Sequence, residues 1–97
     1  AEITGESRKL IEAHADYLRT HPALKVVIEG NADERGSAEY NVALGQRRAD
    51  GVSKIMGLLG IRQERIETVS FGKEKPKAGG HDESSWSENR RSDIVYR

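Results

Sequence analysis

The sequence predicts an α/β (α+β) domain, a two-layer sandwich in which two main helices cover one face of a small mixed β-sheet. Helix-like and strand-like apolar periodicities alternate along the 97 residues, in the order α-β-α-β-short α-β. This length suits one modest hydrophobic core, and no internal repeat or linker divides the chain. We therefore expect residues 1–97 to form one domain.

The composition excludes several classes of protein. Sixteen Lys and Arg residues balance sixteen Asp and Glu residues, which argues against a general nucleic-acid binder, since such proteins usually carry a basic excess. The chain has no cysteine, so disulfides, thiol catalysis and cysteine-ligated metals are excluded. No apolar run approaches the length that spans a membrane.

The first half of the chain predicts a helix, a strand and a longer helix. Capping candidates lie within residues 3–7, and helical spacing then relates Leu10, Ile11, His14, Tyr17 and Leu18. This helix should end near Thr20, because His21 precedes Pro22 and a residue before proline disfavours helical geometry. Residues 25–29 form a short β-branched strand.

A polar loop follows this strand and leads into the second helix. The loop covers residues 30–38, and the helix is expected from Glu39 to Leu59, with Gly60 just beyond its end. We expect a strand over residues 65–71, a long polar loop, a short helical turn over 84–88 and a last strand over 93–96. Ser85 and Glu88 have the spacing of a capping box for the short helix.

Arg48 stands out on the second predicted helix. Four apolar residues form the stripe of this helix: Leu44, Val52, Ile55 and Leu59. Arg48 lies in line with the stripe, whereas Arg47 is rotated toward the polar side. A buried guanidinium needs a partner, because breaking a buried ion pair costs roughly 3–5 kcal/mol. The alternative is that its stem covers apolar surface while its head reaches water.

Asp33, in the loop before the same helix, is the candidate partner or co-ligand of Arg48. The plainer interpretation is a loop carboxylate that accepts backbone amides. If both side chains line one pocket, they suit a zwitterion: Arg48 takes a carboxylate and Asp33 an ammonium. Each such hydrogen bond to a charged group is worth about 1.5–3 kcal/mol. An amino-acid-like ligand fits this pair better than a phosphate, which Asp33 would repel.

Other polar clusters have weaker signals. Residues 81–83, His-Asp-Glu, suggest a metal or acid–base site, but adjacent residues do not converge and no second histidine lies at ligand spacing. We expect His14 and His21 to be structural. Trp86 is interpreted as a satellite core anchor rather than a stacking platform, and residues 89–91 as a solvated basic spot. A glycosidase-type carboxylate pair stays open, although no feature isolates one.

The loop and second helix also carry a family signature. GNADERGSAEYNVALGQRRA, residues 30–49, resembles the signature of the OmpA-like C-terminal domain, in the branch of the peptidoglycan-associated lipoproteins of Gram-negative outer membranes. The resemblance continues through TVSFGKEKP (68–76), GHDE (80–83) and NRR (89–91), and covers practically the whole chain.

The resemblance implies a function. It implies a non-enzymatic domain that binds the stem peptide of peptidoglycan through meso-diaminopimelate and tethers the outer membrane to the cell wall, in the Tol-Pal system. It further implies a periplasmic location and a TolB-like propeller protein as partner. We expect neither a cofactor nor a metal. The membrane would be reached through an N-terminal lipid, and the family's lipidated Cys and first strand, with an acidic residue that lines the site, would precede Ala1.

The resemblance also assigns site residues. Asp33 and Arg48 match the family's diaminopimelate-binding Asp and Arg, and Asn41, Arg90 and Arg91 match further ligand-binding positions. The chain departs from the pattern at residues 31–32, where Asn and Ala stand in place of the His or Tyr and the Thr of many members.

Two other functions are weighed against this one. The first is a protein-interaction module in which Asp33 and Arg48 form a structural ion pair. The second is a cell-wall hydrolase acting through Asp33, Glu34 or residues 81–83, against which stand the missing nucleophile and the missing metal-ligand spacing.

Overall fold

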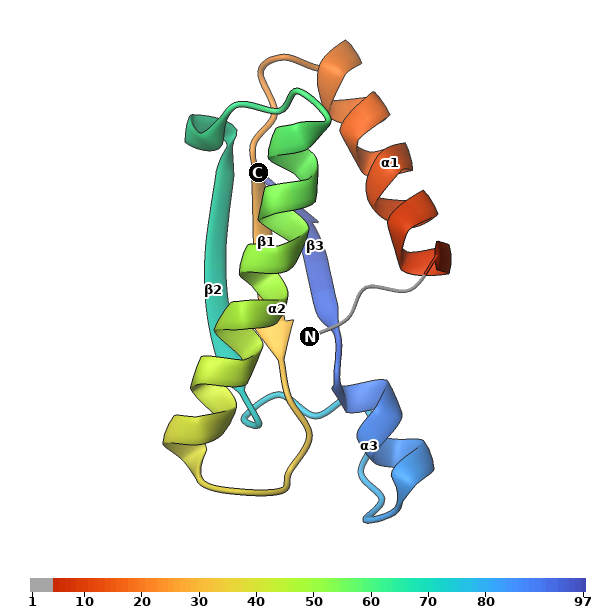
Figure 1. The fold of residues 1–97 in the computed structure, drawn as a ribbon, viewed down its shortest axis with the longest axis vertical. Coiled ribbons are helices and arrows are strands. Elements are labelled where there is room, and N and C mark those ends of the chain that lie inside the picture. Colours follow the sequence, from red (N-terminus) through yellow and green to blue (C-terminus); the bar gives the residue numbers. More distant parts are fainter. Residues whose placement is uncertain (1–4) are drawn as a thin grey trace.

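A computed structural model describes residues 5–97 and contains the predicted order of helices and strands (Figure 1). Part of the predicted cap region, residues 3–4, lies outside the described residues. The elements are α1 Gly5–Thr20, β1 Val26–Asn31, α2 Ala38–Leu58, the 3₁₀ turn η1 Gln63–Arg65, β2 Ile66–Gly72, α3 Glu83–Asn89 and β3 Ser92–Tyr96. The predicted boundaries agree with these to within two residues. No helix within residues 5–97 is long and apolar enough to cross a membrane.

The sheet is mixed, as predicted, with β1 at its centre. The strand order is β2-β1-β3, with β1 parallel to β2 and antiparallel to β3. Its neighbours on both sides, together with the helical layer, bury Val26 and Ile28 almost completely. The chain therefore leaves the centre of the sheet at Asn31, and the residues that follow are held at its end.

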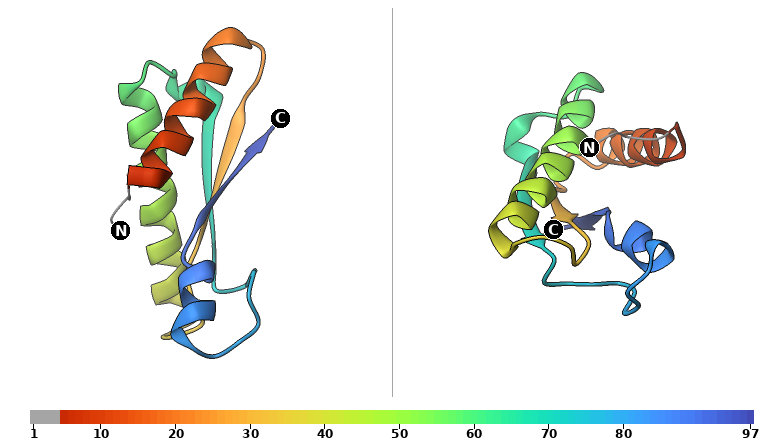
Figure 2. Two further views of the ribbon diagram at one scale, coloured as in Figure 1. Left: turned by 90° about the vertical axis from the view of Figure 1, so that its right-hand side faces the viewer. Right: turned by 60° about the horizontal axis from the view of Figure 1, so that its bottom comes forward.

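Both long helices cover the same face of the sheet, which gives the predicted two layers (Figure 2). The core contains buried residues of α1, β1, α2 and the turn after α2: Ile11, Ala15, Leu18, Val26, Ile28, Ala49, Val52, Ile55, Met56 and Ile61. The helical spacing of Leu10, Ile11, His14, Tyr17 and Leu18 predicts that these residues form the inner face of α1, which is partly wrong. Leu10 is 60% exposed and Tyr17 is 47% exposed. Ala15 takes their place because Ile11, Ala15 and Leu18 have the four- and three-residue spacing of one helical face.

Two glycines set how closely α2 approaches β1. A methyl group at Gly30 would overlap the carbonyl oxygen of Gly45. This oxygen belongs to the backbone of α2, so it cannot rotate away as a side chain could. Ser37 caps the helix by accepting a hydrogen bond from the Tyr40 amide at 3.1 Å. Gly60 follows the helix with φ +95°, which confirms the predicted end. The close approach brings the first half of α2 against the end of β1.

The predicted capping box of the short helix is wrong. Helix α3 begins at Glu83, and its N-cap is Asp82, whose carboxylate accepts the Ser85 amide at 2.9 Å. Ser85 therefore lies inside the first turn rather than before it. Aspartate is as good an N-cap as serine, and it comes earlier in the chain, so the helix starts sooner than the serine spacing predicts.

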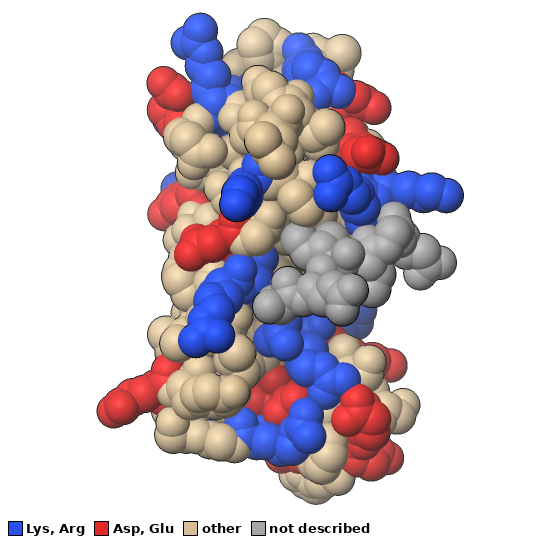
Figure 3. All heavy atoms as spheres, viewed as in Figure 1, with Lys and Arg blue, Asp and Glu red and all other residues tan. Residues whose placement is uncertain are grey.

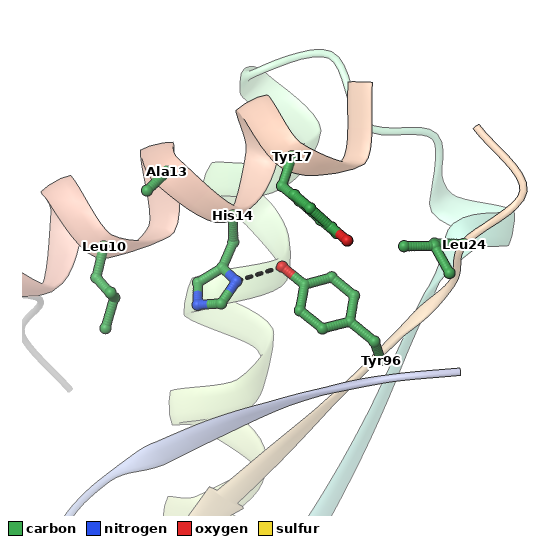
Figure 4. Close-up of a pocket in the computed structure, with 6 residues that line it drawn as sticks. All are labelled: Leu10, Ala13, His14, Tyr17, Leu24 and Tyr96. Carbon is green, nitrogen blue, oxygen red and sulfur yellow. Dashed lines mark hydrogen bonds between the residues drawn. The ribbon is translucent and has the colours of Figure 1, made fainter. Parts of the chain in front are cut away.

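An apolar hollow of about 510 Å³ lies between α1 and β3, away from the charged loops. Figure 4 shows its lining residues, Leu10, Ala13, His14, Tyr17, Leu24 and Tyr96. The His14 ring hydrogen-bonds to the Tyr96 hydroxyl, and burial lowers the pKa of His14. His21 stacks on Tyr17 with ring centroids 3.9 Å apart. Both histidines thus pack against other side chains, in agreement with their expected structural role.

Candidate functional site

Charged side chains of both signs gather where β1 ends, between the start of α2 and α3. In Figure 3 they occupy the lower end of the molecule, as blue and red atoms in contact with one another. They come from three segments: the loop after β1, helix α2, and α3 with the residue that follows it. The strand, the glycine contact and α3 therefore place together residues that are far apart in the sequence.

Asp33 is the buried anion of this cluster and is only 5% exposed. Its Oδ1 accepts the backbone amide of Arg35 at 3.0 Å and the Arg35 Nε at 3.1 Å. Its Oδ2 accepts Arg35 Nη2 at 2.8 Å and Arg90 Nη1 at 3.1 Å. These bonds, first of all that to the Arg35 side chain, hold the pKa of Asp33 far below its usual range. Asp33 is therefore ionised at any physiological pH.

Arg48 lies beside Asp33 but does not pair with it. The side chain is half-buried, whereas that of Arg47 is exposed, which confirms the predicted phase of the helix. Arg48 Nη1 donates to the Asn31 carbonyl at 3.0 Å, and among the side chains of residues 7–97 no carboxylate lies at ion-pair distance from it. Burial lowers the pKa of Arg48, the charge of Arg90 lowers it further, and that of Asp33 opposes both. The guanidiniums of Arg48 and Arg90 thus lie near each other, and Arg48 has N–H donors that no described side chain accepts.

Arg90, which follows α3, is the arginine that faces the site. Its Nη2 donates to Glu83 Oε1 at 2.5 Å while its Nη1 contacts Asp33. The hydrogen bonds to Glu83 and then Asp33 raise the pKa of Arg90. Glu83 lies seven residues before Arg90, or two helical turns. The backbone of Arg90 therefore follows the end of α3, while its side chain is bonded to the first residue of the same helix.

Two residues assigned by the resemblance do not join this cluster of charges. Arg91 turns away: its Nε donates to Asp93 at 3.1 Å and its Nη2 to the Lys75 carbonyl at 3.0 Å. Asn41 is buried and donates to the Arg35 carbonyl at 2.7 Å. It therefore supports the loop that carries Asp33. A direct role of either residue in ligand binding stays a prediction.

Sequence reasoning missed a second layer of contacts over the loop. The Arg35 guanidinium lies 4.3 Å from the centre of the Trp86 ring, a cation–π contact. Trp86 donates from Nε1 to Glu34 at 2.7 Å, and His81 contacts the same carboxylate at 2.7 Å. Trp86 thus packs against the loop that carries Asp33, rather than anchoring a satellite core as we expected. Asp33 and Arg35 have the spacing of an Asx turn, which was the available signal.

Residues 81–83 act separately rather than as one centre. His81 contacts Glu34, Asp82 caps α3 and Glu83 binds Arg90. In the described part of the chain no group of three or more His, Cys, Asp or Glu side chains is arranged to hold a metal.

Asp33 follows the central strand β1, and Arg48 on α2 donates to the Asn31 carbonyl at the end of that strand. The chain belongs to the OmpA family, whose profile matches residues 1–90. The resemblance noted in the sequence is thereby confirmed.

Named relatives within the family share about half of the residues of this chain. It is 52% identical over 95 residues to the peptidoglycan-associated lipoprotein of Haemophilus influenzae, covering 98% of this chain and 62% of that protein. It is 51% identical over 94 residues to the protein of the same name from Pasteurella multocida, covering 97% of this chain and 63% of that protein. The chain thus spans somewhat less than two thirds of these curated relatives.

A solved structure agrees with the fold. The crystal structure of the peptidoglycan-associated lipoprotein from Burkholderia pseudomallei superposes with a TM-score of 0.93 at 51% identity. The match covers 97% of this chain and 80% of that one. The predicted fold class is confirmed by this likeness together with the strand order described above.

Proposed function

We propose that this domain binds peptidoglycan non-covalently, by gripping the meso-diaminopimelate residue of the stem peptide. It thereby tethers the outer membrane to the cell wall, from the periplasmic face, as part of a lipid-anchored protein. Membership of the OmpA family and the name shared by its half-identical relatives support the binding of peptidoglycan. The choice of diaminopimelate is supported by the geometry of Asp33 and Arg48.

The observation that carries this proposal is that the Arg48 guanidinium is half-buried and has no ion-pair partner among the described side chains. The guanidinium donates to one carbonyl and lies near Arg90, so the site has positive charge that no described carboxylate neutralises. The far end of diaminopimelate bears a carboxylate and an ammonium on one carbon. The carboxylate fits beside Arg48, and the ammonium fits beside Asp33. Each charge-assisted contact contributes about 1.5–3 kcal/mol, which is enough to select for this group.

We propose a TolB-like propeller protein and the Tol-Pal system as the cellular context. This part rests on the resemblance of the loop and second helix to the lipoprotein branch of the family. Mixing the purified domain with such a propeller protein tests it: a complex on gel filtration supports the assignment, and separate elution contradicts it.

We further propose that binding occurs without turnover. Two of the residues that a hydrolase would use, Glu34 and His81, are bonded to each other, and Asp33 is held by two arginines. The rival module with a structural Asp33–Arg48 pair disagrees with the structure, because the ion pairs of Asp33 go to Arg35 and Arg90. Release of soluble muropeptides from purified sacculi by the domain alone would contradict the non-enzymatic proposal.

The direct experiment is a titration of the ¹⁵N-labelled domain with free meso-diaminopimelate, followed by NMR. Amide signals of the loop from Asp33 to Ser37 and of α2 around Arg48 should shift. Signals of α1 should stay in place, because its apolar hollow lies away from the charged cluster. Shifts confined to α1, or none at millimolar ligand, would contradict the proposal.

A further inference from the structure

The Asp33 carboxylate is fully engaged before any ligand arrives. Both of its oxygens accept two hydrogen bonds, and every side-chain donor among them belongs to Arg35 or Arg90. A ligand ammonium at Asp33 must therefore replace a guanidinium that is already there. Which arginine gives way follows from how each one is held.

Arg35 is the less restrained of the two. Its side chain is 53% exposed and is held by Asp33 and by the face of Trp86. The Arg90 side chain is 28% exposed and is bonded to Glu83 at 2.5 Å as well as to Asp33. Moving Arg90 would break two ion pairs, whereas moving Arg35 breaks one, and an exposed guanidinium is readily rehydrated.

We propose that Arg35 is an internal competitor for Asp33: its guanidinium occupies the carboxylate until the ammonium of the ligand displaces it, and this lowers the affinity of the site for every ammonium ligand. This inference rests on the proposed function, because it concerns the same site. On displacement the Arg35 guanidinium moves away from Asp33 toward water, and its contact with Trp86 changes with it. The Arg35 backbone amide keeps its bond to Asp33 Oδ1, so the loop does not have to unfold.

The competition lowers the affinity of all ammonium ligands, so simple amines bind too weakly to be retained, while the selection among ligands comes from the contact with Arg48. A ligand with an ammonium alone exchanges one cation for another at Asp33 and gains little. A ligand that also brings a carboxylate to Arg48 makes an additional contact that Arg35 cannot make. Arg35 therefore weakens binding of every ammonium ligand by a similar factor, and only ligands with the second group bind well enough to compensate.

The test compares Arg35→Gln with Arg47→Gln, a matched control that removes the same charge from an exposed position on α2. Each variant and the wild-type domain are titrated with free meso-diaminopimelate and with cadaverine, a diamine that has ammonium groups but no carboxylate, and affinity is measured by NMR. Arg35→Gln should bind both ligands about two- to fivefold more tightly than wild type, the range expected for loss of one exposed competing ion pair. Arg47→Gln should match wild type. Unchanged or weaker binding by Arg35→Gln would overturn the proposal.

Trp86 supplies a second readout, because it is the single tryptophan of the chain. Its fluorescence should change as meso-diaminopimelate is added to wild type, since Arg35 leaves its resting position over the ring. The change should be lost in Arg35→Gln and kept in Arg47→Gln. Equal changes in all three proteins would contradict displacement.

Two further variants separate this inference from the proposed function. Asp33→Asn and Arg48→Ala should lose binding to purified sacculi. If both retain it, the proposed function fails. If both lose it while Arg35→Gln shows no gain, the function stands and the role of Arg35 is wrong. Circular dichroism and urea unfolding of each variant establish that it is folded. Arg35→Lys keeps the positive charge but lacks the two parallel N–H donors of a guanidinium, so its affinity for the ligand should lie between those of wild type and Arg35→Gln.

Discussion

Arg48 and Asp33 are neighbours that do not pair with each other. Arg48 Nη1 donates to the Asn31 carbonyl at 3.0 Å, while the carboxylate of Asp33 is bonded to Arg35 and Arg90. The close contact of Gly30 with Gly45 fixes this arrangement, because it holds α2 against the end of β1. The site thus contains a buried carboxylate that two arginines occupy, and near it a guanidinium for which no described side chain provides a carboxylate.

The first prediction separates the two adjacent arginines of α2. Arg48→Ala should reduce binding to sacculi by one to two orders of magnitude, because it removes a charge-assisted contact worth about 1.5–3 kcal/mol. Arg47→Ala should bind like wild type, since its side chain is exposed and lies about 100° around the helix from Arg48. A co-sedimentation assay with purified sacculi measures both. Equal losses would show that the half-burial of Arg48 has no bearing on the ligand.

The second prediction concerns acid. Asp33 titrates near pH 3.9 in an unfolded chain, and its hydrogen bonds to Arg35 and Arg90 place its folded pKa lower. The unfolded chain therefore takes up a proton first as the pH falls. The free energy of unfolding should decrease below about pH 4 and lose this contribution as the pH passes the folded pKa. Above about pH 5, Asp33 should give no pH dependence.

Urea unfolding of wild type and Asp33→Asn between pH 2.5 and 7 measures this contribution. The variant should be less stable than wild type at neutral pH. The difference should shrink in acid, since the amide that replaces the carboxylate cannot take up the proton. A stability difference that is the same at every pH would rule out the contribution of the Asp33 charge.

A third prediction tests the contact between helix and strand. Gly30→Ala places a methyl group on the carbonyl of Gly45, so the two backbones must separate. We expect a loss of about 1–3 kcal/mol in the free energy of unfolding, the usual cost of overpacking. Gly79→Ala is the control, because a methyl group there meets no atom within 4 Å. Equal urea midpoints for the two variants would contradict the close approach.

The fourth prediction concerns Arg65, which ties the end of α1 to the start of β2. Its Nη2 donates to the Leu18 and His21 carbonyls at 2.8 Å each, and its Nε to that of Leu24 at 3.0 Å. Arg65→Ala should lower the free energy of unfolding by about 1–3 kcal/mol, because these carbonyls lose a charged donor. Arg62→Ala, at an exposed position with no side-chain capping bond, should stay within about 0.5 kcal/mol of wild type. Thermal or urea unfolding compares them.

The fold was largely predictable because the strongest signals were local. The β-branched run before Gly30, the proline after His21 and Gly60 each mark a boundary that the structure reproduces. The inner face of α1 was predicted less well, because Leu10 and Tyr17 have large apolar or aromatic side chains, which are usually expected to be buried. The helix instead buries the small Ala15, which allows close packing against the neighbouring elements.

The site was predictable only where helix periodicity applied. The phase of α2 set Arg48 on the inner side and Arg47 outside, as the structure shows. The contacts of Asp33 depend instead on a loop shape that Asn41 supports from the helix and Trp86 covers from α3. Such contacts join segments that are far apart in the chain, so spacing within one segment did not reveal Arg35 as the main partner of Asp33.

The central claim is that the site recognises a carboxylate and an ammonium on one carbon, and calorimetric titration with three matched stem peptides tests it most directly. The peptides carry diaminopimelate, diaminopimelate amidated at its far carboxylate, or lysine. We expect the first to bind most tightly. The other two should be tens- to thousands-fold weaker, because a desolvated Arg48 left without its partner costs on the order of 2–5 kcal/mol. Equal affinity for all three peptides would contradict the account.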